Sequence, residues 1–157
     1  MIWIDGSELD LRRFSGKELC QKLAVEMYET DREKWFDCES CIQTALFILD
    51  FDTVCNMEGF STPFDEYFSG DYYTKIIQAF RMIGDEQDAD ILSEALRLDT
   101  YYTKQFESIN DDAKSEALYD EFRDKIDELE KGLYLHTGLD IWVFLYEYLE
   151  NNIRQHP

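Results

Sequence analysis

Proline and glycine are scarce in this chain, and they stand where helices would begin or end. Only two prolines and seven glycines occur in the 157 residues. Because proline breaks a helix interior and glycine weakens it, long segments remain in which helices can form without interruption. Apolar residues recur through these segments at the spacing of an α-helix. The sequence therefore predicts an all-α fold with about six or seven helices.

Size and composition indicate a single compact domain over residues 1–157. A chain of this length can bury roughly 70% of the surface that its unfolded form exposes. Hydrophobic residues make up 45% of it and aromatic residues 15%, which is too much for a disordered chain in spite of the high charge. No linker, internal repeat or low-complexity tract divides the sequence.

Several segments carry distinct helix signals. Residues 15–29 open with a capping box formed by Ser15 and Glu18, and residues 35–54 have the apolar period of a central, well-buried helix. Residues 72–84 and 85–98 predict an antiparallel pair, in which Gly84 ends the first helix and Asp85 starts the second. Residues 111–133 predict a long amphipathic helix.

The two ends of the chain are expected to differ. Residues 137–156 place apolar side chains such as Trp142, Val143 and Tyr146 on a stripe wide enough for the innermost helix. At the amino end, Ile2 and Ile4 alternate ahead of a turn-prone Asp-Gly pair. An isolated two-stranded ribbon is only marginally stable in water, so we expect a short extended arm at most.

The stretch "CNMEGFSTPFDEYFSGD", residues 55–71, interrupts the helical pattern. Its glycines can adopt backbone conformations that other residues avoid, and its large rings are suited to packing. We expect a turn followed by a short aromatic helix that ends at Gly70. The residues of this stretch with an expected structural role are Gly59, Phe60, Phe64, Tyr67, Phe68 and Gly70, and Gly84 joins them further along the chain.

Motifs for catalysis, metal binding or a cofactor are weak. Cys38 and Cys41 have the spacing of a zinc or redox half-site, yet no second close-spaced pair accompanies them. His136 and His156 lack a recognisable nucleophile partner, and no glycine-rich phosphate loop occurs. We therefore predict no catalytic residue, no metal site and no cofactor, and we expect the thiols to lie buried on a helix.

Charge is the most informative property of the sequence for function. Lys and Arg number 15 against 35 Asp and Glu, which gives a formal net charge of −20. Such a surface repels nucleic acid and anionic membranes, and it favours basic partners. Eight acids and no base lie between Lys34 and Lys75, and five acids and no base lie between Arg81 and Arg97. The candidate partner-binding residues are Asp65, Glu66, Asp71, Asp85, Glu86, Asp88, Asp90 and Glu94.

Carboxylates one helical turn apart stand ~5–6 Å from each other, so a helix can present a row of negative charges that resembles a row of phosphates. The alternative is a solvated acidic surface that only keeps the protein soluble. Self-repulsion destabilises a fold, and the lack of interspersed Lys favours a functional face.

The start of the chain lacks the basic and apolar regions of a secretory signal, and no apolar run approaches the ~20 residues that a membrane span needs. A cytoplasmic location without membrane contact is the expectation.

The central region resembles a bacterial family of small helical domains, catalogued as of unknown function, whose best-understood branch is an acidic DNA-mimic protein. The resemblance covers about residues 35–98. It is carried by Gly59-Phe60, by Phe64 with Tyr67-Phe68, by the Ser69-Gly70 break, and by the helix pair "AFRMIGDEQDADILSEALRL". It implies an all-α domain that is often a homodimer, and in that branch the domain occupies the DNA-binding face of a basic transcription regulator.

Three hypotheses for function follow. The first is a non-enzymatic acidic protein that binds a basic protein, such as a DNA-binding regulator, as a DNA mimic and does not itself bind nucleic acid. The second is an immunity or antitoxin-like neutraliser of a basic bacterial toxin. The third is an enzyme that uses buried carboxylates or Cys38 and Cys41.

Overall fold

A computed structural model of the protein describes residues 1–60, 68 and 71–155. The described residues form eight α-helices and two short 3-10 helices. In chain order these are η1 (Leu11–Arg13), α1 (Gly16–Glu26), η2 (Met27–Glu29), α2 (Arg32–Trp35), α3 (Ser40–Glu58), α4 (Asp71–Met82), α5 (Glu86–Glu107), α6 (Asp112–Glu130), α7 (Tyr134–Thr137) and α8 (Ile141–Gln155). Six of the α-helices are long and two have four residues, so the predicted all-α fold in one compact domain is confirmed.

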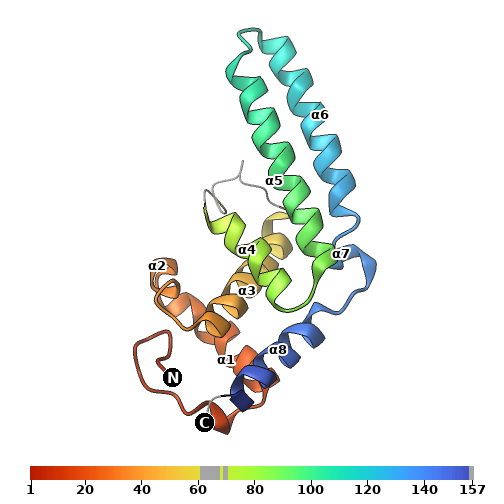
Figure 1. Ribbon diagram of the computed structural model, residues 1–157. Helices are drawn as coiled ribbons and strands as arrows, with labels where there is room; N and C mark the ends of the chain where they lie inside the picture. Colours follow the sequence, from red (N-terminus) through yellow and green to blue (C-terminus); the bar gives the residue numbers. More distant parts are fainter. Residues whose placement is uncertain (61–67, 69–70, 156–157) are drawn as a thin grey trace.

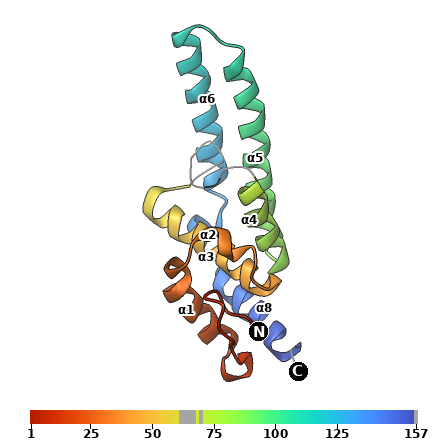
Figure 2. The ribbon, with the colours of Figure 1, turned by 90° about the vertical axis from the view of Figure 1, so that its left-hand side faces the viewer.

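The long helices form a body and a projecting hairpin (Figure 1). In the body, α1 packs against α8, and α3 packs against α4. Helix α5 joins the body through α4, and its second half runs outward beside α6, as both ribbon views show (Figures 1 and 2). The amino terminus and the last turn of α8 lie at the end of the molecule opposite the hairpin tip.

Helix α3 is the centre of the core. Twelve of its 19 residues are buried, and they lie on every side of the helix. A helix that is apolar all round is stable only when other helices surround it, and α1, α4 and α8 do so here. Helix α8, which we expected to be innermost, buries the single row Ile141, Leu145, Leu149 and Ile153. Val143 of the predicted stripe is 50% exposed. The predicted stripe is therefore correct at Leu149 and Ile153 but wrong in its first half, where Ile141 and Leu145 are buried and Val143 is not.

The first helix begins as the sequence predicts. The Ser15 hydroxyl accepts from the Glu18 backbone N–H, and the Glu18 carboxylate accepts from the Ser15 N–H at 2.8 Å, which completes the capping box. The expected extended arm is also present. Ile2 and Glu8 form an isolated antiparallel bridge, and Trp3 between them is buried and donates to Glu26 at 2.7 Å.

Two glycines end helices in conformations that other residues rarely adopt. Gly59 closes α3 with φ 86°, and Gly84 follows α4 with φ 90°. Phe60 and Phe68 are buried against Phe51, with ring centroids 6.3 and 5.7 Å from it. The expected short helix, with Phe64, Tyr67 and Gly70, lies outside the described residues.

Candidate acidic binding surface

Asp85 and Asp88 are interior residues. Asp85 is the N-cap of α5 and its carboxylate accepts from the Asp88 backbone N–H at 3.1 Å. The Asp88 carboxylate accepts from the backbone N–H of Tyr134 at 3.0 Å, which fixes the start of α7. The two residues are 3% and 0% exposed. Both were predicted from the sequence to bind a partner. That prediction is corrected, because their buried side chains cannot contact a partner in this conformation.

The second acidic segment lies between Arg81 and Arg97, and both of these arginines form ion pairs with its carboxylates. Arg81 bridges Glu86 and Asp90, with its contact to Asp90 at 2.9 Å, and Arg97 pairs with Glu94 at 2.6 Å. The expectation of an unneutralised face here is therefore corrected. A count along the sequence missed these pairs because the α4–α5 turn and the i,i+3 spacing on α5 bring cations from outside the run onto it.

The first acidic segment, between Lys34 and Lys75, is also divided between the core and the surface. Asp71 is exposed in the first turn of α4, whereas Asp65 and Glu66 lie outside the described residues. Asp52 is partly buried and accepts from the Tyr134 hydroxyl at 2.7 Å, and burial raises its pKa. Asp50 is fully buried and pairs with Arg32 at 2.7 Å. Among the described acids of this segment, Asp37, Glu58 and Asp71 are exposed, so only part of the segment is available for a partner.

A different row of carboxylates lies on the outer side of α6. Glu116, Asp120 and Asp124 follow one another at i,i+4 spacing and all are exposed. No ion pair to these three side chains is found among the residues that the structure describes. Glu128 continues the row and pairs with Lys131 at 2.6 Å. We call Glu116, Asp120 and Asp124 the α6 row.

Sequence reasoning missed the α6 row because cations are interspersed along α6. The helix contains eight acids and three bases. Arg123 pairs with Asp127 at 3.6 Å and Lys125 pairs with Glu121 at 3.4 Å, so neither cation forms an ion pair with the α6 row. Counting charges at i,i+4 spacing along the predicted helix would have found the row.

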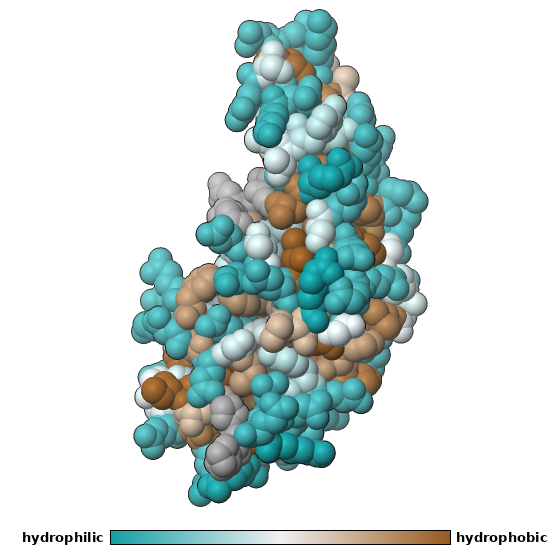
Figure 3. Space-filling view, viewed as in Figure 1, coloured by the Kyte–Doolittle hydropathy of each residue, from teal (hydrophilic) through white to brown (hydrophobic). Residues whose placement is uncertain are grey.

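The α6 row rests on a well-packed hairpin. On the opposite side of α6, Phe122 and Ile126 are buried. The Phe122 ring lies 5.4 Å from that of Tyr102 on α5, and the Tyr102 hydroxyl donates to Glu121 at 2.5 Å. These contacts hold α6 against α5, so the carboxylates stand on a fixed support. In the space-filling view, hydrophilic residues cover most of the projecting hairpin (Figure 3).

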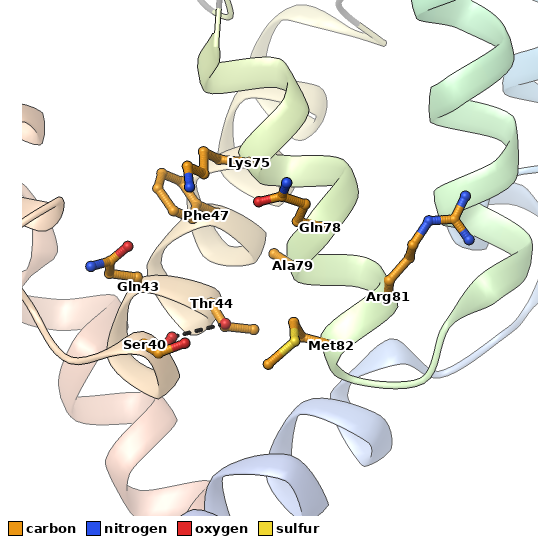
Figure 4. Close-up of a pocket in the computed structure, with 9 residues that line it drawn as sticks. All are labelled: Ser40, Gln43, Thr44, Phe47, Lys75, Gln78, Ala79, Arg81 and Met82. Carbon is orange, nitrogen blue, oxygen red and sulfur yellow. Dashed lines mark hydrogen bonds between the residues drawn. The ribbon is translucent and has the colours of Figure 1, made fainter.

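A shallow groove of about 290 Å³ lies between α3 and α4 (Figure 4). Its lining includes the hydroxyls of Ser40 and Thr44 and the side chain of Lys75, and Thr44 donates to the Ser40 carbonyl at 2.9 Å. Arg81 at its edge points away from the groove, toward α5. The described lining contains no Asp, Glu, His or Cys side chain.

The cysteines considered as a redox or metal pair are poor nucleophiles. Cys41 is buried and Cys38 is partly buried, and both are free thiols. Burial raises the pKa of the Cys41 thiol to about 11 and also raises that of Cys38. Both thiols are therefore protonated at neutral pH, which disfavours nucleophilic attack and metal binding.

The described residues contain neither a metal-binding cluster nor a helix that could span a membrane. In residues 1–60, 68 and 71–155, no group of three or more His, Cys, Asp or Glu side chains is arranged to hold a metal ion. Within the same residues, every helix is too short or too polar to cross a lipid bilayer.

Comparison with known proteins places the chain in a family. A search among curated proteins finds no match, and a search among solved structures finds none either. The profile of the DMP19-like protein family matches residues 38–156, which include α3 to α8. Because this match extends over most of the chain, the protein belongs to the DMP19-like family.

Proposed function

We propose that this protein binds the cationic, nucleic-acid-binding face of a basic protein and competes there with the nucleic acid. The observation that carries the proposal is the α6 row, an exposed line of carboxylates on the projecting hairpin. A net charge of −20 also repels nucleic acid, so the natural partner is a protein with an excess of Lys and Arg.

The dimensions of the α6 row suit such a partner. With a rise of 1.5 Å per residue, carboxylates four residues apart are spaced at about 6 Å along α6. One strand of DNA carries a charge per ~3.4 Å of helix axis, so the α6 row has about half that density. Three aligned charges at this spacing can pair with Lys or Arg side chains that normally contact phosphates.

The α6 row also costs stability. Like charges at i,i+4 destabilise a helix by roughly 0.2–0.5 kcal/mol per pair, and Glu116, Asp120 and Asp124 make two such pairs. A surface that served solubility alone could pair these carboxylates with cations, as Asp127 and Glu121 of the same helix are paired. The family match over residues 38–156 agrees with the resemblance seen in the sequence, and that resemblance implies a branch that acts as a DNA mimic.

A capture and competition experiment tests the proposal. The immobilised protein is exposed to a native extract, and bound proteins are eluted with a salt gradient and identified. We expect a basic DNA-binding protein whose fluorescent DNA duplex is released when this protein is added. Binding of the partner and its duplex at the same time, with no release of DNA, would contradict the proposal. Capture of a basic toxin whose activity is blocked would favour the antitoxin-like function instead.

The matched control uses variants of equal charge. One variant carries Glu116→Gln, Asp120→Asn and Asp124→Asn, which neutralises the α6 row. The other carries Glu8→Gln, Glu33→Gln and Glu147→Gln, which removes the same charge from exposed positions on the body. Only the first is expected to lose the ability to displace DNA. Equal loss in both variants would show that net charge, and not the α6 row, governs binding.

A further inference from the structure

The turn between α4 and α5 contains two buried carboxyl groups with no cation beside them. One oxygen of Asp85 accepts from the Asp88 N–H at 3.1 Å, and one oxygen of Asp88 accepts from the Tyr134 N–H at 3.0 Å. The second oxygens, Oδ2 of both residues, are buried and have no hydrogen-bond partner among the described residues. A buried polar atom without a partner is costly, and an unpaired buried charge is more so.

In the described part of the chain, no basic side chain neutralises either carboxyl group. Among the described residues, no Lys or Arg pairs with Asp85 or Asp88, and the undescribed residues 61–67, 69–70 and 156–157 contain neither residue type. On the surface nearby, Arg81 is engaged by Glu86 and Asp90. The other elements around the turn add no cation. Tyr134 of α7 bonds to Asp52 of α3, Cys55 of α3 lies close to the same ring, and Phe144 of α8 lies next to Gly84. His136 of α7 is exposed and faces Glu130.

Two ionised carboxylates can only accept hydrogen bonds, whereas a carboxylic acid can donate to a neighbouring carboxylate. One proton between the two groups would give both Oδ2 atoms a partner and would leave one negative charge, which the backbone N–H groups stabilise. We propose that Asp85 and Asp88 share one buried proton, and that this proton keeps α7 docked on the α4–α5 turn. Loss of the proton would place two like charges in an interior site without a counter-ion and would expel the Asp88 side chain from Tyr134.

The electrostatics of the site agree with the geometry. Burial, a hydrogen bond that the protonated Asp88 donates to the Asp85 carboxylate, and repulsion by the Asp85 charge together raise the pKa of Asp88 to about 8. In the unfolded chain an Asp ionises near 3.9. Between these two pH values the folded protein holds a proton that the unfolded chain has released, so stability falls as pH rises from about 4 to about 8. The buried proton is therefore lost just above neutral pH.

Infrared spectroscopy of the unaltered full chain tests the shared proton directly. At pH 6.5 we expect a carboxylic-acid C=O band that disappears on titration to pH 9.5 and is absent in Asp88→Asn. The exposed neighbour variant Asp90→Asn should retain the band. Absence of the band at pH 6.5 in the unaltered chain would overturn the proposal, whether or not the variants fold. A band that is present and also persists in folded Asp88→Asn would overturn the assignment to this pair.

Unfolding in urea and amide hydrogen exchange provide a second test. One proton released on unfolding changes the unfolding equilibrium constant tenfold per pH unit. Between pH 6 and pH 8 this constant should rise by up to about a hundredfold more in the unaltered chain and in Asp90→Asn than in Asp88→Asn. Exchange protection of the Tyr134 amide should be lost above pH 8 in the unaltered chain and in Asp90→Asn, but not in Asp88→Asn. The same pH dependence in Asp88→Asn would overturn the proposal.

Discussion

Asp50 lies in the middle of α3 with a fully buried side chain, and it accepts hydrogen bonds from Tyr28, Arg32 and Tyr72 at 2.6–2.9 Å. These donors come from η2, α2 and α4, so one carboxylate ties three elements to the central helix. Arg32 balances the charge, and the two hydroxyls satisfy the remaining lone pairs. In this acidic protein, Asp50 acts as a structural residue although the sequence places it in a run of acids.

Replacing Asp50 tests this role. Asp50→Ala leaves Arg32 and two tyrosine hydroxyls without their acceptor, so we expect the free energy of unfolding to fall by about 3 kcal/mol. Urea unfolding at pH 7 measures the change. Glu33→Ala removes an exposed carboxylate of α2 and should change stability by less than about 0.5 kcal/mol. Equal effects of the two substitutions would contradict the structural role of Asp50.

At the scale of the element, the contact between α1 and α8 depends on the absence of a side chain at Gly16. A methyl group built on Gly16 would lie 2.1 Å from the Tyr146 carbonyl oxygen, which is part of the backbone of α8. The Gly16 N–H donates to Glu150 of α8 at 2.6 Å, and this contact lowers the pKa of the Glu150 carboxyl. The two helices can approach this closely only because residue 16 is glycine.

Gly16→Ala therefore reverses the usual effect of that substitution. At an unstrained helical position, Gly→Ala stabilises by about 0.4–1 kcal/mol because it restricts the unfolded chain. Here the methyl group must push α1 and α8 apart, and we expect a net loss of about 2 kcal/mol or more in the free energy of unfolding. Ser15→Ala, which breaks the capping box alone, should cost about 1 kcal/mol. An increase in stability for Gly16→Ala would disprove the close approach.

Most helices could be predicted from the sequence because their signals are local. The capping box of Ser15 and the helix stop at Gly84 depend on residues within one or two turns. The break between α2 and α3 was missed, because Trp35 has the same apolar period as α3 yet belongs to the helix before it. The first half of the α8 stripe was misplaced because its neighbours, and not its own pattern, decide that Leu145 is buried and Val143 exposed.

At the scale of the whole molecule, tertiary structure sorts the 35 acidic residues into different roles. Some are buried, as Asp85 and Asp88 are, and others are paired with arginines that the fold brings to them. The candidate surface predicted from runs of acids was largely lost for this reason, since neither burial nor pairing across a turn can be read from a linear count. The α6 row remains on the hairpin and faces solvent.

A single charge reversal separates function from stability on this hairpin. Asp120→Lys replaces two repulsive i,i+4 pairs, with Glu116 and Asp124, by two attractive ones. It also replaces an attractive i,i+3 neighbour, Arg123, by a repulsive one, so the free energy of unfolding should rise by a net of roughly 0.5–1 kcal/mol. Capture of the basic partner should fall at the same time. Unfolding in urea and a binding titration measure the two effects, and Glu147→Lys on α8 is the control of equal charge. A variant that is more stable and still binds the partner with unchanged affinity would show that the α6 row has no binding role.

The salt dependence of partner binding tests the central claim most directly. The dissociation constant is measured from 50 to 300 mM NaCl for the unaltered chain, the variant neutralised at Glu116, Asp120 and Asp124, and the control neutralised at Glu8, Glu33 and Glu147. We expect a steep loss of affinity with salt in the unaltered chain and the control, and a clearly shallower slope in the α6 variant. If the dissociation constants of the two variants depended equally on salt, this would contradict the claim that the protein binds its partner through the outer side of α6.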